Sequence, residues 1–378
     1  MAASLLPAMS DMAITRFPGI IAGAMRRTIL LLHLCGALLA GLFLIVLGVT
    51  GAIMAFEEDL DRLMNPALYA SHPEREPLGV SAILSALRSS HPTERISRLQ
   101  LPQVRGGPFI TQIANRQVFV DGATGSINGT RSGPTLLVRI HQFHISLMSG
   151  RPGSVILGVA SILLVVLIGT GLYLWWPHKR SRVELRRVTG FDLHNAIGIW
   201  SSPLVAILGA TGIIIAFSET VIPLVYALSG SSPPARDAPS TIQPGSQPIT
   251  PEDAIRTAVA TLPGAAPLAL TCPSQPSSSY VVALRFPEDL TPGGRSWVVV
   301  DHYRGVPLVI EDSRHPPAGA GVATLNRAIH TGDIGGYAGK AAVSAASVAL
   351  VVQVISGAWL WWQRRRRQAQ AGRRQVAA

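Results

Sequence analysis

Four histidines lie inside or directly before apolar stretches of a kind that cross lipid bilayers. His33 stands among leucines in MRRTILLLHLCGALLAGLFLIVLGVTGAIMAF, and His194 begins a second such stretch. His144 and His330 come shortly before two further apolar runs. An imidazole that leaves water must find another polar partner. Because neutral imidazole is a strong axial ligand for haem iron, all four side chains are candidate iron ligands.

The spacing around these histidines occurs twice. Thr50–Gly51 and Ala55–Phe56 follow His33, and the same residue pairs follow His194 at an offset of 161. At an offset of 186, the pattern after His144 is repeated after His330; it comprises Gly150, Gly153, Gly171 and Trp175–Trp176. We interpret the chain as an internal duplication. The predicted fold class is membrane α-helical, with four transmembrane helices as a duplicated pair of hairpins and two external α+β modules.

The depth of each histidine suggests how they pair. At 1.5 Å per residue, the helix from His33 to Thr50 covers about 25 Å. His33 and His194 therefore lie near one membrane face, and His144 and His330 near the other. Two histidine pairs at opposite ends of a four-helix bundle suit two bis-histidine haems. The alternative is that each imidazole is only a hydrogen-bond partner between helices.

Other residues have weaker claims to such a site. His141 lies three residues before His144 and corresponds to Arg327 in the second copy, so it is a substitute ligand or a neighbour of a haem propionate. His72, His91, His302 and His315 are expected to be solvated loop residues. A flat macrocycle could approach the helix backbone at glycines, which also serve plain helix packing; these are Gly36, Gly41, Gly48 and Gly198.

The elements that position these residues follow from hydropathy. The chain has 378 residues, of which 48% are hydrophobic, and four stretches reach the roughly 20 apolar residues that a membrane helix needs. They are Thr28–Phe56, Ser154–Trp176, Gly198–Phe217 and Ala341–Trp362. We divide the chain into residues 1–27, 28–56 (span one), 57–135 (module one), 136–176 (interfacial segment and span two), 177–193 (basic loop), 194–217 (span three), 218–320 (module two), 321–362 (interfacial segment and span four) and 363–378 (basic tail).

The net charge of +11 is explained by membrane topology rather than by nucleic-acid binding. Basic residues gather before span one, between spans two and three, and after span four; they include Arg26, Arg27, Lys179, Arg180 and Arg364–Arg367. Acidic residues, beginning with Glu57, start the opposite side. This side bias predicts both termini in the cytoplasm and large loops outside. Span one is too long for a cleaved signal and reads as an uncleaved anchor.

The two external loops match each other. Each contains a short helix candidate, VSAILSALRSS or PEDAIRTAVATL, followed by alternating strand-like runs. A turn after Val120–Asp121 corresponds to one after Val300–Asp301. SGSSPPARDAPSTIQPGSQP is predicted to be a flexible lead into the second module. The only two cysteines, Cys35 and Cys272, fall in a span and a loop and are not expected to pair.

These motifs together resemble the PepSY-associated transmembrane family of iron-regulated inner-membrane proteins. The likeness rests on LHLCGALLAG…GVTGAIMAF, HISLMSGRPGSVILG…GTGLYLWWP, DLHNAIGIW…GATGIIIAF and IHTGDIGGYAGKA…SGAWLWWQRRRR, and it extends over residues 25–367. The strands VFVDGATG and VVVDHYRG resemble the closing strand of PepSY modules. One departure is Leu34–Cys35, because family members usually carry a basic or aromatic residue after this first histidine.

The resemblance implies a location and a reaction. Members studied as ferric-siderophore reductases bind haem b and reduce iron chelates on the periplasmic face. The matching histidines here are His33, His144, His194 and His330. We expect an inner-membrane haem protein that takes electrons from a cytoplasmic or membrane donor and reduces a ferric siderophore. The alternatives are a non-redox PepSY-type binding or regulatory protein and an iron-chelate permease.

Overall fold

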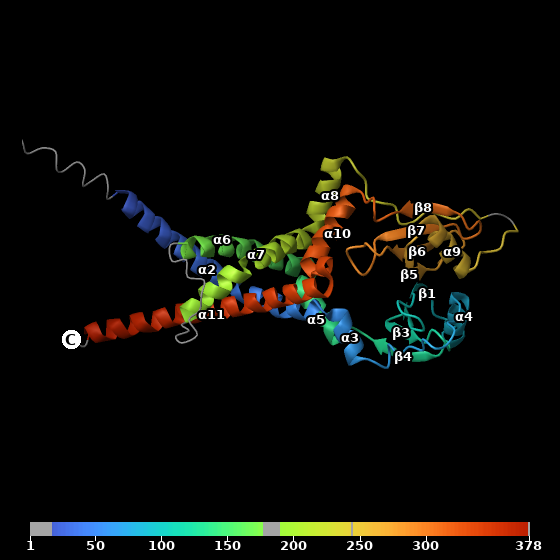
Figure 1. Cartoon of the computed structure of the whole chain (residues 1–378), viewed down its shortest axis with the longest axis horizontal. Helices are drawn as coiled ribbons and strands as arrows, with labels where there is room; N and C mark the ends of the chain where they lie inside the picture. Colours follow the sequence, from blue (N-terminus) through green and yellow to red (C-terminus); the bar gives the residue numbers. More distant parts are fainter. Residues whose placement is uncertain (1–16, 177–189, 243–244, 377–378) are drawn as a thin grey trace, which may run out of the picture. The chain divides into compact units, whose positions relative to one another are not determined.

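The computed structural model describes residues 17–176, 190–242 and 245–376. The predicted basic loop at 177–193 and the termini fall largely outside these ranges. Four described helices are long and apolar enough to cross a membrane. They are α2 (Phe17–Met54), α6 (Arg151–Trp175), α7 (Gly190–Ala216) and α11 (Gly336–Val376), which contain the four predicted spans apart from one or two residues at their ends. The chain divides into two compact units, a helical unit and a sheet unit (Figure 1).

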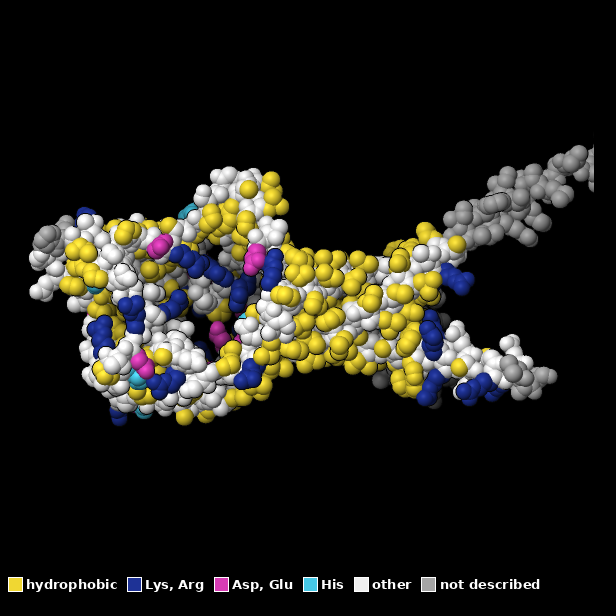
Figure 2. Space-filling model, turned by 180° about the vertical axis from the view of Figure 1, so that it is seen from behind, with side chains coloured by type: hydrophobic (Ala, Val, Ile, Leu, Met, Phe, Trp, Pro, Cys, Tyr) yellow, Lys and Arg dark blue, Asp and Glu magenta, His cyan; other side chains and the backbone are white. Residues whose placement is uncertain are grey.

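The helical unit is a bundle with one shared core. Ala40 and Leu44 of α2, Leu164 of α6, Val205 of α7 and Leu350 of α11 are buried together. Hydrophobic side chains cover the face of the bundle that Figure 2 shows, and Lys and Arg gather at one of its ends. A helix set that is apolar outside as well as inside suits a lipid environment. The chain is therefore a multi-pass membrane protein, as predicted.

Two short helices precede spans two and four. They are α5 (Leu136–Ser146), which carries His144, and α10 (Ala318–Thr331), which carries His330. Gly153 permits the close contact of α5 with α6, because a methyl group there would overlap the Ser146 carbonyl. Gly339 approaches Gly332 in the same way at the start of α11. These contacts explain the repeated glycines that the sequence shows after both histidines.

The sheet unit holds eight antiparallel strands in the order β4-β3-β2-β1-β5-β6-β7-β8. The strands are β1 (Ile96–Gln100), β2 (Phe109–Ile113), β3 (Arg116–Val120), β4 (Ile127–Ser132), β5 (Ala266–Thr271), β6 (Tyr280–Arg285), β7 (Ser296–Val300) and β8 (Pro307–Glu311). β1 pairs with β5, with Leu99 opposite Leu270. The two predicted modules therefore share one continuous sheet, which the sequence analysis did not anticipate.

Two helices cover one face of this sheet. They are α4 (Val80–Ser90) and α9 (Pro251–Thr261), and both match the predicted helices to within a residue. Ile83, Leu87, Ala254 and Ala258 pack with the strand side chains that face them in a single buried core. The two modules therefore share one hydrophobic core. Two further helices of the unit were not predicted, α3 (Glu57–Met64) and α8 (Ser218–Ser229).

The Pro/Ser-rich segment before α9 differs from its prediction. In its described part, the Ser240 amide donates to the Ser277 carbonyl at 2.9 Å, and the Ala235 carbonyl accepts from the Trp297 indole at 3.0 Å. Backbone groups of the segment are thus satisfied by the sheet's own strands and loops. The segment is anchored rather than a free linker.

Candidate functional site

His33 and His194 occupy matching environments in the helical unit. The Nδ1 atom of His33 lies 2.9 Å from the Thr170 hydroxyl of α6. His194 on α7 makes the same contact with Ser356 of α11, at 3.0 Å. Each imidazole is half buried. The offsets of 161 and 186 that relate the two histidines and their helices thus relate their hydroxyl partners as well.

A glycine lies beside each of these imidazoles. A Cβ on Gly171 would lie 3.3 Å from Cε1 of His33, and one on Gly357 would lie 3.1 Å from Cε1 of His194. Both glycines directly follow the hydroxyl residue that bonds the ring. A larger residue would push each imidazole away from the hydroxyl that orients it. The repeated Thr–Gly and Ser–Gly pairs thus form a cradle for each ring.

The hydroxyl contacts determine which ring nitrogen carries the proton. The Thr170 hydroxyl donates its only hydrogen to the Val166 carbonyl at 2.9 Å, and the Ser356 hydroxyl donates to the Gln353 carbonyl at 3.1 Å. When each hydroxyl donates to its carbonyl, its oxygen accepts from the imidazole, and the ring proton is then on Nδ1. Nε2 keeps its lone pair. This is the tautomer that an iron-ligating histidine needs, with the other ring nitrogen held by a hydrogen bond.

Gln353 contacts the remaining nitrogen of His194. Its side-chain amide donates to Nε2 of His194 at 3.2 Å, which agrees with a proton on Nδ1. The amide lies against Gly198, where a Cβ would crowd it. Its Oε1 atom is buried and has no hydrogen-bond partner. An orphaned buried carbonyl costs free energy, so this amide is the least satisfied group at the site.

His33 and His194 also lie near enough to each other for their charges to interact. They come from α2 and α7, helices far apart in sequence. The predicted pairing of these two histidines is therefore consistent with the fold of the bundle. A pair of imidazoles that carry the proton on Nδ1 suits a bis-histidine haem.

His144 repeats the hydroxyl contact at a different place in the helical unit. Its Nδ1 lies 2.8 Å from the Thr50 hydroxyl of α2, and that hydroxyl donates to the Val46 carbonyl at 2.6 Å. By the same reasoning Nδ1 of His144 holds the proton. Gly51 makes room for the ring, since a Cβ there would lie 3.2 Å from Cε1 of His144.

His330 and His141 remain less well defined. His330 is half buried in the last turn of α10, which ends at Gly332 in a left-handed conformation with φ 80°. Thr211, which corresponds to Thr50 in the second copy, donates to the Ile207 carbonyl at 2.7 Å in the same way. His141 is half buried on α5, one turn before His144. The pairing of His144 with His330 stays a prediction.

Three of the glycines singled out from the sequence lie against side chains of neighbouring helices. Gly41 faces Val354, and Gly48 faces Val351 and the Ser347 carbonyl, so both bring α2 close to α11. Gly36 faces Leu167. The glycines that touch an imidazole are Gly51, Gly171 and Gly357. Sequence reasoning noted them only as repeat markers, and it missed Thr170, Ser356 and Gln353.

Two buried carboxylates organise equivalent turns in the sheet unit. Oδ1 of Asp121 accepts from the amides of Ala123 and Thr124, and Oδ1 of Asp301 accepts from those of Tyr303 and Arg304. Burial alone would raise the pKa of each carboxyl, but these hydrogen bonds outweigh burial and hold both pKa values below normal. His72, expected to be solvated, pairs through Nε2 with Asp121 at 3.3 Å. These residues stabilise the fold rather than form a reactive site.

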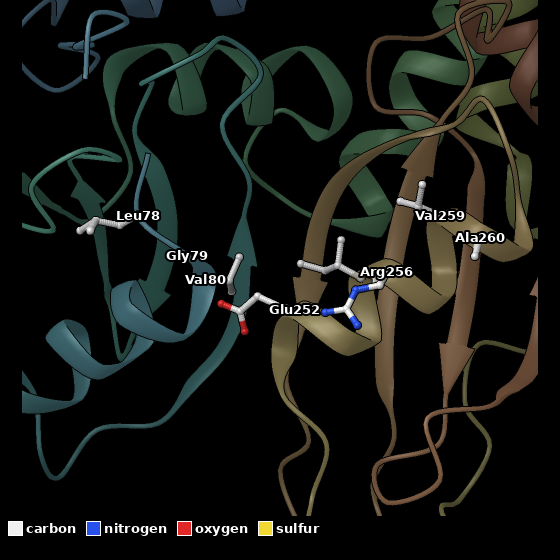
Figure 3. A pocket seen from close by; sticks show the side chains of 8 residues that line it. Leu78, Gly79, Val80, Glu252, Arg256, Val259 and Ala260 are labelled. Atoms are coloured by element: carbon white, nitrogen blue, oxygen red, sulfur yellow. The ribbon is translucent and has the colours of Figure 1, made fainter. Parts of the chain in front are cut away.

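A shallow hollow of about 510 Å³ lies between α4 and α9. Its lining is mainly aliphatic, with Glu252 and Arg256 at the surface (Figure 3). The Glu252 carboxylate accepts from the Ser81 amide at 2.6 Å and also from the Ser81 hydroxyl. It thereby caps α4, whose N-cap residue is Gly79. Burial would raise the pKa of Glu252, but the Ser81 hydrogen bonds lower it overall.

No group of three or more His, Cys, Asp or Glu side chains in the described ranges is arranged to hold a metal ion by itself. Cys35 and Cys272 are both free.

A protein-family comparison decides the relationship. The family model described as the PepSY-associated TM region matches residues 30–364. The chain belongs to this family. The match includes all of α6 and α7, most of α2 and α11, and all eight strands of the sheet unit. No curated protein matches the chain.

Proposed function

We propose that this PepSY-associated membrane protein is a haem b oxidoreductase of the bacterial inner membrane. It takes electrons from a cytoplasmic or membrane donor and reduces a ferric siderophore on the periplasmic side, so that iron is released as Fe²⁺. The observation that carries this proposal is the shared state of His33, His144 and His194. In each of them a hydroxyl accepts from Nδ1–H, so Nε2 is the nitrogen with the lone pair; in His194 this lone pair accepts from the Gln353 amide.

The chain's own residues supply the surroundings for such a cofactor. Thr170 and Ser356 orient the two imidazoles, and Gly171 and Gly357 leave room beside them. The apolar core of Ala40, Leu44 and Leu164 excludes water from the bundle. Bound haem would supply a one-electron carrier, since its iron cycles between Fe³⁺ and Fe²⁺. We propose two haems, one between His33 and His194 and one between His144 and His330, to span the roughly 30 Å apolar layer.

The orientation follows from charge. Arg364–Arg367 lie beyond the apolar part of α11, and Glu57, Glu58 and Asp59 begin α3 directly after span one. We place the arginine-rich end in the cytoplasm by the positive-inside rule. The sheet unit then lies in the periplasm, where it would meet the chelate.

The first test is a dithionite-reduced minus oxidised absorbance spectrum of the protein purified after expression with ample haem. We expect sharp low-spin b-type bands. His33→Ala and His330→Ala are each expected to lose part of the haem, since each removes a ligand from a different site. His315→Ala is the matched control, because its exposed side chain lies on a loop. A colourless wild-type protein would overturn the proposal.

The second candidate is a non-redox binding or regulatory protein, and the aliphatic hollow between α4 and α9 favours it. In that case the histidines would only hold helices together through their hydroxyl contacts. A wild-type protein that is folded but colourless would favour this candidate. An iron-chelate permease is less well supported, because each membrane helix has an 18-residue stretch with at most two charged residues, which gives a chelate path little charged lining.

A further inference from the structure

Four arginines of the sheet unit form no ion pair among the described residues. Arg285 and Arg295 are half buried, and the Nε atom of each is shielded from solvent without a hydrogen-bond partner. Arg236 and Arg327 are exposed. Among the residues that the structure describes, none of the four guanidinium groups forms an ion pair or donates a hydrogen bond. The other partly buried arginine of this unit, Arg131, is held by Asp61 at 3.0 Å.

Three of these arginines lie on the sheet face that α4 and α9 leave uncovered. Leu284 and Val298 point into the core under α9. Side chains alternate along a strand, so Arg285, which follows Leu284, and Trp297, which precedes Val298, point to the other face. Arg295 precedes Trp297 by two residues and shares its face. Leu284 pairs with Ser296, which brings Arg285 and Arg295 side by side.

The anchored segment before α9 adds the next member. The guanidinium carbon of Arg236 lies 4.7 Å from the centre of the Trp297 ring. The indole Nε1 donates to the Ala235 carbonyl at 3.0 Å, which fixes the ring and the arginine above it. This arrangement is a cation–π contact that keeps one side of the indole occupied. Arg236 is thereby held over the same face as Arg295.

Arg327 of α10 completes the group. Arg327 and Arg236 are both near enough for their charges to act on Arg295. Burial, followed by these two charges, lowers the pKa of the Arg295 guanidinium, and Asp289 opposes them. Glu311, opposite Trp297 in β8, also feels the charge of Arg236. Positive charge is thus gathered here, and within the described part of the chain none of the four arginines forms an ion pair with a carboxylate.

Like charges gathered around the half-buried Arg285 and Arg295 cost free energy unless an anion offsets them. Arginine is suited to that role, because its planar guanidinium binds a carboxylate through two parallel hydrogen bonds. We propose that Arg236, Arg295 and Arg327, with Arg285 and Trp297 beside them, bind an anionic ferric chelate through its carboxylates. The inference rests on the proposed function, which supplies the premise that the ligand contains iron. It restricts the substrate class to anionic, carboxylate-bearing chelates.

The place of Arg327 connects this site to the candidate electron path. Arg327 and His330 lie three residues apart on α10, so their side chains emerge on the same side of the helix. A chelate held by Arg327 would thus lie beside the histidine proposed to ligate haem. This proximity gives the arginines a positioning role for reduction as well as a binding role.

The test is the binding of gallium citrate, a redox-inert stand-in for ferric citrate, to the full-length protein in an uncharged detergent. Isothermal titration calorimetry gives the Kd. Losing one charge-assisted hydrogen-bonded partner is expected to weaken binding by about tenfold or more, so Arg295→Gln should raise the Kd by that factor and Arg236→Gln/Arg295→Gln by more. Arg88→Gln is the matched control. It removes one exposed charge from α4, on the covered face and away from the hollow, and we expect its Kd to stay within about twofold of wild type.

The outcomes separate this inference from the proposed function. Unchanged Kd values in both variants would overturn it. The wild-type protein must also prefer gallium citrate: if it bound cationic gallium desferrioxamine B or metal-free citrate equally tightly, the inference would be overturned. Loss of the haem Soret band in Arg295→Gln with gallium binding intact would also overturn it, by assigning the arginines to haem propionates. A colourless wild-type protein that binds gallium citrate through Arg295 would support the binding site and overturn only the electron transfer.

Discussion

Ser356 accepts a hydrogen bond from Nδ1 of His194 at 3.0 Å, because its own hydroxyl hydrogen is committed to a carbonyl of the same helix. The contact fixes both the orientation of the imidazole and the position of its proton. Thr170 does the same for His33. The membrane helices thus prepare both rings in the state in which a neutral histidine binds iron.

Removing either hydroxyl should weaken haem binding. Partners that orient a metal-ligating histidine typically contribute about 10- to 100-fold in affinity. We therefore expect Thr170→Val and Ser356→Ala to raise the haem Kd by that order, measured by titrating haem into apo-protein at the Soret band. The reduction potential should shift as well, since the imidazole loses the acceptor that makes it more basic.

Ser201→Ala serves as the control for these variants. The Ser201 hydroxyl donates to the Ile197 carbonyl on α7 at 2.7 Å, so the variant removes a hydroxyl from the same helix as His194 without removing an imidazole contact. Haem affinity as high in Ser356→Ala as in Ser201→Ala would show that the hydroxyl does not orient a ligand.

Gln353 should slow haem uptake. Its amide occupies Nε2 of His194, the atom that iron would need, and the corresponding residue of the other copy is Leu167. Releasing a hydrogen bond worth about 1 kcal/mol should speed uptake about fivefold. We expect Gln353→Leu to show this in stopped-flow mixing of apo-protein with haem. The reciprocal Leu167→Gln should slow haem uptake. If Gln353→Leu took up haem more slowly than wild type, Gln353 would instead be part of the haem site.

Asp301→Asn should destabilise the sheet unit more than Asp121→Asn. Oδ2 of Asp301 accepts from the Thr241 amide, and an Asn NH₂ turned toward that amide would set two donors against each other. Asp121 faces His72, which can accept instead. We expect a loss of roughly 1–3 kcal/mol for Asp301→Asn, measured by hydrogen exchange of the amides in the β7–β8 turn. Equal losses in the two variants would contradict this explanation.

The same pair of variants carries a pH dependence. The folded-state pKa of Asp301 lies below its ordinary value because the backbone amides outweigh burial. Its contribution is therefore fully present above the unfolded-state pKa and is lost as the pH falls through the folded-state pKa. The fall in thermal unfolding midpoint between pH 7 and pH 3 should be smaller in Asp301→Asn than in wild type.

Hydropathy and repeats predicted the membrane part well. The four apolar stretches became α2, α6, α7 and α11, since a membrane helix satisfies its backbone internally and depends mainly on its own composition. The helices α4 and α9 were predicted because their periodicity is local. The repeated glycines were correctly noticed, but only the structure shows that Gly171 touches an imidazole whereas Gly41 touches Val354.

What could not be predicted depends on contacts distant in sequence. The strand β1 has only five residues. It pairs with β5 of the other module, and the two strand edges that meet there exist only after each module has folded. The partner of His33 lies 137 residues away at Thr170. A hydroxyl before a repeated glycine is a signal that was available, because Thr170–Gly171 and Ser356–Gly357 share the offset of the histidine repeat.

The junction of the sheet suggests how such a chain could have arisen. β1 and β5 come first among the strands of their respective modules and meet antiparallel, with Leu99 opposite Leu270. Two identical half-length chains would meet in the same way across a two-fold axis, each covering the exposed edge of the other. An ancestral homodimer joined by gene fusion would therefore keep its interface as the middle of one sheet. After fusion the two halves were free to diverge, one of them acquiring the arginines that its counterpart lacks.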